Sequence, residues 1–345
     1  MRILVGMMHP KHVYMFKNFI RVMVQRGHEV RIVTVEKDLT ETLLKRANLP
    51  YDHIGENPTS FLGKLFNTPL WIFRTYNISR RFKPDIFVGQ AFPHFAHVAA
   101  LQGKPYIIFE DSEPAHVVQS ITFPFASSIV TPSCYREDLG KKHVKSESYF
   151  ELAYLHPNHF SPSKSVLKDL GLQDGEKYVV VRFVSWSAVH DIGQEGGFNL
   201  EKKRELIQEI AKYCKVIVSS ESPLPKDLEK YRITLAPDKI HDLVYYATLV
   251  IGDSQTMTTE AGVLGTPAIR CNSFVGKDDM GNFLELENSY GLIFNYRSAD
   301  EAIGKAIELL QDNTIVETWL AKRKRLLKEK CDFSQYMVEY VEGYL

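Results

Sequence analysis

Residues 240–267 read IHDLVYYATLVIGDSQTMTTEAGVLGTP and predict a helix, a strand, a tight turn and a second helix in succession. The apolar run 249–251 has the length of a strand, and Ser254 after Gly252-Asp253 can cap the helix that follows. Gly265-Thr266-Pro267 then returns the chain to a new strand at 268–270. Free backbone N–H groups are therefore expected at the start of the second helix, at the carboxyl edge of a parallel sheet.

This helix start is suited to a phosphate or a pyrophosphate, because free N–H groups and the positive end of the helix dipole favour an anion. Thr256 and Glu260 lie one helical turn apart on one face, whereas Met257 belongs to a separate apolar stripe. Thr256 would hold phosphate oxygens, and Glu260 would accept from the hydroxyls of a ribose. The alternative is that Ser254 only caps the helix and Glu260 is a solvated carboxylate. The strand that follows at once favours the nucleotide-diphosphate site.

Length and charge limit the classes of protein to consider. A chain of 345 residues exceeds what one hydrophobic core usually supports, so we expect two domains of roughly 150 residues each. The 42 basic and 42 acidic residues balance, so no global field attracts nucleic acid or anionic lipid, and any anion site must be local. The four cysteines have no paired short spacing, which argues against a disulfide framework and predicts a reducing, cytoplasmic location. The apolar run at 3–5 is far shorter than the roughly 20 residues of a membrane span, and we expect no transmembrane segment.

Strand candidates alternate with helical patterns along both halves of the chain. They are residues 3–5, 30–35, 86–88, 106–109 and 129–131, and then 178–181, 216–219, 233–235, 249–251, 268–270 and 292–294. By the crossover rule, each half is a parallel sheet covered by helices, so the fold class is α/β with two Rossmann-like, doubly wound domains. The expected divisions are a first domain at 1–157, a Pro- and Ser-rich linker at 158–165, a second domain at 166–328 and a helical tail at 329–345.

Six spaced motifs carry a resemblance to a known family. They are His9-Pro10 with His12, Lys83-Pro84-Asp85, Glu110-Asp111-Ser112-Glu113, the segment from Glu151 to Pro157, Arg182-Phe183-Val184-Ser185-Trp186 with His190-Asp191, and residues 240–267. Together they resemble the GT-B superfamily, which includes nucleotide-sugar glycosyltransferases and non-hydrolysing UDP-N-acetylglucosamine 2-epimerases. Over nearly the whole chain the sequence is most similar to an uncharacterised GT-B-like family, domain of unknown function 354.

The resemblance implies that the second domain binds the nucleotide across a cleft from the first, which binds an acceptor or supplies catalytic groups. It also implies that the final helix crosses back to the first domain. Expected partners are a nucleotide sugar, UDP-linked, and a sugar or glycan acceptor; a homodimer is compatible with the resemblance. One departure concerns Gln255-Thr256, where the epimerases carry a Gly pair. Side chains at these two positions narrow the approach to the phosphates.

Further candidates for nucleotide binding follow the strand at 178–181. Arg182 would neutralise a pyrophosphate by bidentate contact, and Trp186 would stack on a base or sugar. Alternatively, Arg182 pairs with a structural carboxylate and Trp186 belongs to the core. His241, just ahead of the turn, is expected near the phosphates or sugar, with a capping or core role as the alternative. The full set of nucleotide-binding candidates is Arg182, Ser185, Trp186, His241, Ser254, Gln255, Thr256, Met257 and Glu260.

An acidic cluster supplies the candidates for proton transfer. Glu110, Asp111 and Glu113 follow the strand at 106–109, and acids so closely spaced raise the pKa of at least one of them. A general base is then available to deprotonate an acceptor hydroxyl or to remove a sugar C2 proton. The alternative is that Ser112 or Asp111 caps the following helix.

Histidines complete the set of candidates. His9 and His12 follow the first strand, His94 and His97 follow the strand at 86–88, and we expect at least one histidine to contact the ligand. No carboxylate flanks either pair to complete a metal site, so no metal is expected. The catalytic candidates are therefore Glu110, Asp111, Glu113, His9 and His190.

Together with these patterns, the resemblance to the GT-B superfamily implies a metal-independent glycosyltransferase that needs no cofactor besides its nucleotide-sugar substrate. A 2-epimerase-like isomerase is the first alternative, with the acidic cluster supplying the proton-transfer groups. The second is a non-catalytic nucleotide-sugar or glycan-binding protein, because fold does not fix function. The loop at 6–12 has one glycine, which disfavours an NAD enzyme, and no Gly-x-x-x-x-Gly-Lys-Ser/Thr loop points to an ATPase.

Overall fold

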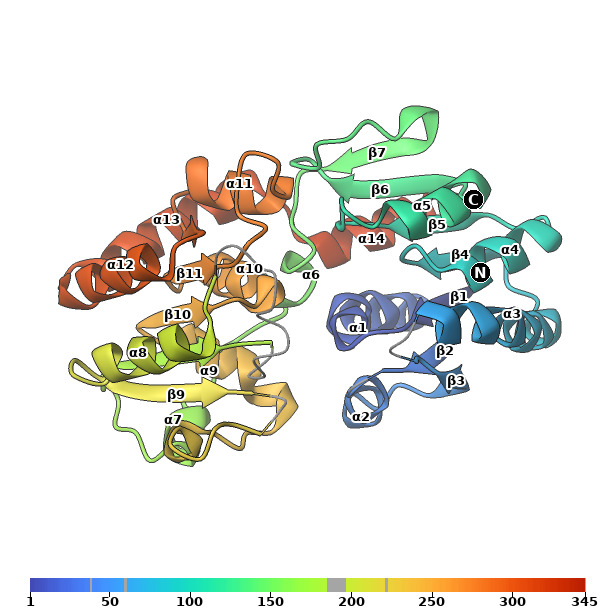
Figure 1. The fold of residues 1–345 in the computed structure, drawn as a ribbon. Helices are drawn as coiled ribbons and strands as arrows, with labels where there is room; N and C mark the ends of the chain where they lie inside the picture. Colours follow the sequence, from blue (N-terminus) through green and yellow to red (C-terminus); the bar gives the residue numbers. More distant parts are fainter. Residues whose placement is uncertain (38, 59–60, 185–196, 221–222, 345) are drawn as a thin grey trace. The chain divides into compact units, whose positions relative to one another are not determined.

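A computed structural model describes residues 1–37, 39–58, 61–184, 197–220 and 223–344 (Figure 1). The chain divides into two compact units: unit 1 comprises Met1–His159 and Lys330–Leu345, and unit 2 comprises Phe160–Glu329. The chain passes from unit 1 to unit 2 between His159 and Phe160, within the segment 158–165 considered as a linker. In the part of the chain that is described, no helix is both long enough and apolar enough to cross a bilayer.

The sheet of unit 1 has seven parallel strands in the order β3-β2-β1-β4-β5-β6-β7. The strands are β1 (Arg2–Met7), β2 (Glu29–Glu36), β3 (Tyr51–Glu56), β4 (Ile86–Gly89), β5 (Tyr106–Phe109), β6 (Ser128–Pro132) and β7 (His143–Ser146). The order reverses between β1 and β4, which hydrogen-bond to each other. Such a switch point leaves a crevice beyond the carboxyl ends of the strands, where ligands collect in open α/β sheets.

Helices cover unit 1 in two groups of three. Within each group, one helix packs on the other two. One group is α1 (Pro10–Gln25), α2 (Thr40–Arg46) and α6 (Leu152–Leu155), in which α1 packs on both of the others. The other group is α3 (Phe61–Phe82), α4 (Pro93–Leu101) and α5 (His116–Thr122), in which α4 packs on both α3 and α5. Aromatic side chains fill the core between helices and sheet: the Phe87 and Phe95 rings meet edge to face, 5.5 Å between centroids.

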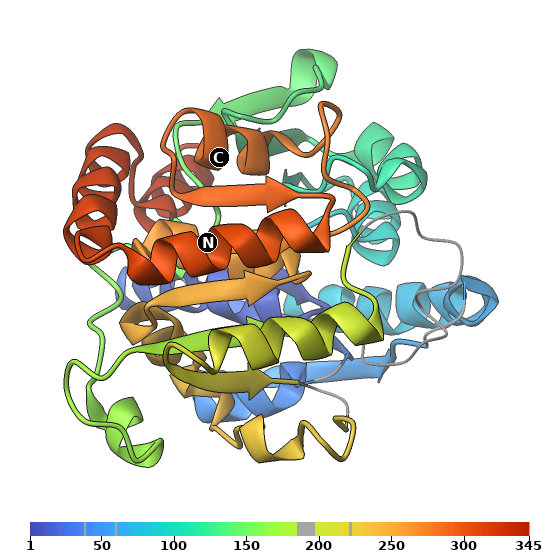
Figure 2. The same cartoon turned by 60° about the vertical axis from the view of Figure 1, so that its left-hand side comes forward.

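The sheet of unit 2 has five parallel strands in the order β12-β11-β10-β8-β9. They are β8 (Tyr178–Arg182), β9 (Lys215–Ser219), β10 (Leu249–Gly252), β11 (Ala268–Cys271) and β12 (Ile293–Tyr296). Helices α8 (Leu200–Ile210) and α12 (Ala299–Gln311) lie side by side against this sheet (Figure 2). The remaining α-helices are α7 (Ser165–Asp169), α9 (Ile240–Tyr246), α10 (Gln255–Leu264), α11 (Gly281–Asn288) and α13 (Ile315–Glu329).

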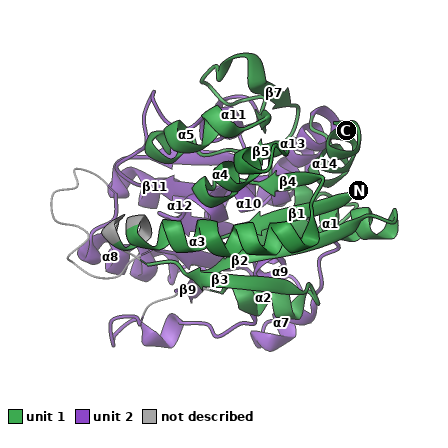
Figure 3. Cartoon of the chain, turned by 90° about the vertical axis from the view of Figure 1, so that its right-hand side faces the viewer, with its two compact units in different colours: residues 1–159, 330–345 green, residues 160–329 purple. Residues whose placement is uncertain are grey.

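The last helix, α14 (Phe333–Glu342), belongs to unit 1 rather than to unit 2, although it follows α13 in sequence (Figure 3). It packs on α1 and α6, and the Phe333 ring stacks on Phe150 with 4.5 Å between centroids. Asp332 caps the helix by accepting from the N–H of Gln335, and it also accepts from Nε2 of His159. The buried residues of α14, including Met337 and Val338, thus complete the core of unit 1.

Most strands lie within a residue or two of the expected positions, and the errors fall where burial is low. The strands β3 and β7, which have no apolar run, were not anticipated; both are edge strands of the seven-stranded sheet. Edge strands need less apolar surface, so their sequences carry a weak signal. The strand expected at 233–235 is wrong: Arg232, just before it, makes an isolated bridge to Val218, the Ile233 N–H donates to the Val218 carbonyl, and none of the residues 233–235 is buried.

Gly252 joins β10 to β8 at the switch point of unit 2. A Cβ atom at this position would lie 1.8 Å from the carbonyl oxygen of Arg182, a distance that no packing can accommodate without moving a strand. We predict that Gly252→Ala lowers the free energy of unfolding by more than about 3 kcal/mol, because overpacking here displaces backbone. The matched control is Gly304→Ala on α12, where nothing lies within 4 Å of the added atom. It should stabilise by about 0.5–1 kcal/mol in chemical denaturation. Equal effects from the two substitutions would contradict this packing.

Candidate functional site

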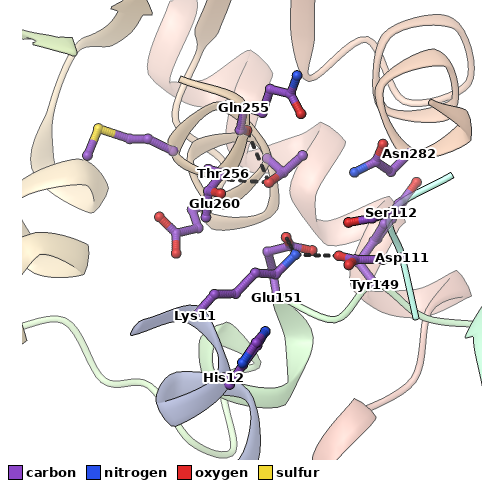
Figure 4. A network of polar contacts seen from close by, with 12 residues as sticks. Lys11, His12, Asp111, Ser112, Tyr149, Glu151, Gln255, Thr256, Glu260 and Asn282 are labelled. Atoms are coloured by element: carbon purple, nitrogen blue, oxygen red, sulfur yellow. Dashed lines mark hydrogen bonds and ion pairs between the residues drawn. The ribbon is translucent and has the colours of Figure 1, made fainter. Parts of the chain in front are cut away.

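The first turn of α10 in unit 2 presents unused backbone donors. Ser254 is the N-cap, and its hydroxyl accepts weakly from the N–H of Met257, at 3.4 Å. Gln255 is exposed and Thr256 is half-buried (Figure 4). None of the hydrogen bonds between described residues uses the backbone N–H of Gln255 or Thr256. Among the residues that the structure describes, two N–H groups at the positive end of a helix therefore remain available for an anion.

Glu260 lies one turn further along the same helix and is buried, with 6% of its surface exposed. The Nε2 atom of His241, on α9, lies 3.0 Å from Glu260 Oε1. Because an ionised carboxylate only accepts, the His241 ring donates in this hydrogen bond. Residues 257–264 of α10 are all buried. The alternative in which Glu260 is a solvated carboxylate is therefore wrong. Met257 belongs to this buried part of the helix and faces the interior.

Arg182 ends β8 directly beside Gly252, so its side chain starts at the same sheet edge as the α10 turn. Its Nη1 donates to the hydroxyl of Ser219, at 3.3 Å. Asp253, the residue before the cap, accepts from the N–H of Val184 at 2.8 Å, and burial raises the pKa of its carboxyl. This bond fixes the start of the loop after β8. Ser185, Trp186 and His190 fall in the segment 185–196, outside the described residues.

The corresponding edge of unit 1 carries a buried cluster of opposite charges. Lys11, on the first turn of α1, forms an ion pair with Asp111 after β5, and its Nζ lies 3.4 Å from Glu151 Oε1 (Figure 4). Asp111 and Glu151 are both buried. Burial alone would lower the pKa of the Lys11 amine, but the two carboxylates outweigh it and raise that pKa. Lys11 therefore stays positively charged.

Glu110 stands behind this ion pair with 3% of its surface exposed. One carboxyl oxygen accepts from the N–H groups of Asp111 and Ser112, and the other accepts from Ala91 at 3.3 Å. Burial, reinforced by the charge of Asp111, raises the pKa of Glu110 to about 7. The acidic cluster thus contains one group that exchanges protons near neutral pH, as the spacing of the acids suggested.

The other roles considered for the acidic cluster are resolved by its hydrogen bonds. Helix α5 begins at His116 with no side-chain cap, so the alternative in which Ser112 or Asp111 caps it is wrong. Glu113 accepts from the backbone N–H of Arg136 at 2.6 Å, across to the loop after β6. This contact gives Glu113 a structural role, because it joins the loop after β5 to the loop after β6.

His9 and His12 of unit 1 form structural hydrogen bonds. His9 caps α1, and its Nδ1 accepts from the N–H of Lys11 at 3.2 Å. His12 accepts from the N–H of Met8 at Nδ1 and donates from Nε2 to Gln90 Oε1, at 2.7 Å. Burial lowers the pKa of His12 well below its usual value and that of His94 to about 3, so both rings are neutral at pH 7. Across the residues described, no three His, Cys, Asp or Glu side chains converge as metal ligands.

Three residues of this cluster were not singled out for a role from the sequence: Lys11, Glu151 and Gln90. Each lies within two residues of the start of a helix or the end of a strand, which is the one signal that would have marked them. Gln90 follows β4, and its backbone carbonyl accepts from the Tyr106 hydroxyl. Its side-chain Nε2 is buried and has no partner among the described residues. A buried donor of this kind is costly unless something accepts from it.

The Lys11 cluster supports a direct prediction about stability. Replacing Lys11 with Met leaves Asp111 and Glu151 buried together without their cation, and breaking a buried pair in this way should cost about 3 kcal/mol. The double variant Lys11→Met with Asp111→Asn should recover part of this loss, because one of the two unpaired charges is gone. Urea denaturation at pH 7 measures both. Losses that simply add would show that Lys11 and Asp111 are not coupled.

A known protein family matches this chain from end to end. The sequence profile described as "Protein of unknown function (DUF354)" covers residues 1–345, so the chain belongs to this family. An uncharacterized protein of Methanocaldococcus jannaschii is 21% identical over 280 residues, which span 77% of this chain and 80% of that protein. The family was anticipated from the six motifs, and this expectation is confirmed.

Solved structures with the same fold include both epimerases and glycosyltransferases. MnaA of S. aureus, solved with UDP, has a TM-score of 0.71 at 12% identity and covers 99% of this chain and 96% of its own. The UDP-GlcNAc 2-epimerase of Neisseria meningitidis, bound to UDP-GlcNAc, has a TM-score of 0.70 at 13% identity, and the match covers 99% of this chain and 100% of the epimerase. The spinosyn forosaminyltransferase SpnP has a TM-score of 0.66 at 13% identity, and the match covers 99% of this chain and 98% of the transferase. The chain therefore has the GT-B fold, and the expected fold class is confirmed.

Proposed function

We propose that this protein is an enzyme acting on a nucleoside-diphosphate sugar, and that the first turn of α10 binds the diphosphate. The observation that carries this proposal is a pair of N–H groups, at Gln255 and Thr256, that no described residue accepts from, at the switch point of the unit 2 sheet. A diphosphate is the anion that such a turn accommodates best. Structures of the same fold have been solved with UDP and with UDP-GlcNAc, which agrees with this choice of ligand.

The neighbours of the turn suit the rest of a nucleotide. Glu260 is buried one turn from the proposed phosphate position and is oriented by His241, so its carboxylate would accept hydrogen bonds from ribose hydroxyls. Arg182 begins at the same edge and would add a positive charge to the leaving diphosphate. Helix dipole and guanidinium together would stabilise that charge without a metal ion.

The reaction we propose is transfer of the sugar to an acceptor hydroxyl. In unit 1, Glu110 would take the hydroxyl proton, because a base with a pKa of about 7 combines a useful ionised fraction with a useful proton affinity at neutral pH. The Lys11 ammonium, fixed between Asp111 and Glu151, would hold the Asp111 carboxylate in place beside it. Asp111 in turn holds the pKa of Glu110 up.

Epimerisation at the sugar C2 is the second candidate, and the buried acids of unit 1 favour it. Removal and return of a carbon-bound proton needs groups that change protonation near pH 7 in a site shielded from water, and Glu110 meets both conditions. Gln90, whose buried Nε2 has no partner among the described residues, would donate to a sugar oxygen near that base.

Two assays on the purified full-length chain separate these reactions. Calorimetry and thermal shift against UDP, GDP, CMP and ADP-linked sugars should first show saturable binding of one donor class, since a ligand at about 100 times its Kd stabilises by about 2.7 kcal/mol. With that donor, release of free nucleotide that depends on an added acceptor identifies a transferase. A second sugar nucleotide formed without acceptor, seen by NMR, identifies an epimerase. Absence of binding by every donor would refute the proposal.

A further inference from the structure

Exposed apolar side chains are concentrated on one face of unit 1. Eight of the 15 large apolar side chains exposed among the described residues lie between residues 66 and 125. On α3, Phe66, Leu70 and Phe73 recur at spacings of four and three residues, so they form one outward stripe. Phe66 is 79% exposed and Phe73 is 62% exposed. Single exposed apolar residues are ordinary, but a stripe of aromatic and aliphatic side chains marks an interaction surface.

Helix α5 and the short turn after it extend this apolar surface. Val117 and Ile121 stand one turn apart on α5 and are both exposed, with Phe125 following at the turn Phe123–Phe125. Because α4 packs on both α3 and α5, the three helices make one layer, and Figure 3 shows them together on the side of unit 1 that faces the viewer. We call this layer, from α3 to Phe125, the α3–α5 face.

The charge of this face is strongly biased in a chain whose net charge is zero. Helices α3, α4 and α5 together contain four Lys or Arg residues, all of them on α3, and no Asp or Glu, which gives the three helices a charge of +4. From residue 114 to residue 135 there is no Lys, Arg, Asp or Glu. Arg80 continues the α3 stripe two turns beyond Phe73, and Arg80 and Arg81 are both exposed.

We propose that the α3–α5 face docks the protein on an anionic lipid surface. Apolar side chains beside basic ones fit a bilayer boundary, where the former enter the interface and the latter meet anionic headgroups. Charge excludes the simplest rival occupant: in a symmetric dimer the same patch meets itself, and two sets of helices that each carry a charge of +4 repel. The membrane is bound at its surface, since α3 carries Arg74, Arg80 and Arg81 along its length.

Co-flotation of the full-length chain with vesicles tests this docking face. The chain should float with phosphatidylcholine vesicles that contain phosphatidylglycerol, and should stay behind with phosphatidylcholine alone. Arg80→Gln with Arg81→Gln should weaken binding about 25-fold, because each basic side chain near an anionic surface contributes about fivefold. Phe66→Ser with Phe73→Ser should weaken it by about tenfold or more. Circular dichroism and thermal unfolding confirm that each variant remains folded.

The matched control is Lys324→Gln with Lys328→Gln on α13, which removes two exposed basic side chains from unit 2. It should leave flotation unchanged. Loss of binding in this control equal to that of the α3 variants would overturn the assignment, as would wild-type protein that never floats. Light scattering that shows a dimer dissolved by Phe66→Ser with Phe73→Ser would assign the face to a second copy of this chain instead.

Discussion

Thr256→Glu should weaken binding of a nucleoside diphosphate by about 100-fold or more while leaving the protein at least as stable as the wild type. The new carboxylate would stand on the first turn of α10, beside the proposed phosphates. Two like charges about 4 Å apart repel by about 4 kcal/mol at a protein surface, which exceeds the loss that we predict. The same carboxylate favours the positive end of the helix by about 0.3–1 kcal/mol. Binding and stability therefore change in opposite directions.

Thr256→Gln is the control for this prediction, because Gln has the size of Glu without its charge. Its affinity for UDP should fall much less than that of Thr256→Glu, measured by calorimetry beside thermal unfolding of all three proteins. If Thr256→Glu bound UDP as tightly as Thr256→Gln, the phosphates would have to lie elsewhere in the molecule.

Glu110→Gln should lower kcat/KM by about 100-fold to 10,000-fold with little change in nucleotide affinity, since a positioned general base contributes in that range. The pH profile gives a second readout. The pKa of Glu110 is raised to about 7, so the base is protonated below neutrality and ionised above it. Wild-type activity should therefore rise as pH increases through about 7, and the Glu110→Gln variant should lack this rise.

Glu113→Gln distinguishes the two glutamates of the cluster. Glu113 accepts from the backbone N–H of Arg136, and a Gln side-chain oxygen can accept the same bond. This variant should keep both the turnover and the pH profile of the wild type. The role assigned to Glu110 fails if Glu110→Gln keeps its activity, or if Glu113→Gln loses as much.

The fold of this chain can be predicted from its sequence because the strands of a buried parallel sheet must be apolar. Strands β1, β5 and β10 are runs such as Leu249-Val250-Ile251 that end at Gly or polar residues, and each gives a clear signal. The edge strands β3 and β7 escape notice because half of their surface needs no apolar cover. The segment 233–235 misleads for the opposite reason: its apolar residues look like a strand but find no sheet to bury them.

The sequence predicted the residues of the site only where a single segment of the chain contains them. Ser254, Thr256 and Glu260 lie on a single turn and helix, so spacing alone placed them together. The Lys11 cluster joins residues after β1, after β5 and at α6, which approach each other only through the strand order of the sheet. A single sequence does not give that order. For the same reason, the burial that raises the pKa of Glu110 was foreseen only as repulsion between neighbouring acids.

The central claim is that the two unused N–H groups of α10 bind a diphosphate, and the NMR signals of those two amides test it most directly. In a titration of the isotope-labelled full-length chain with UDP, the amide signals of Gln255 and Thr256 should show the largest shifts, and their hydrogen exchange should slow as the site fills. Saturable UDP binding that leaves both signals in place would contradict the claim.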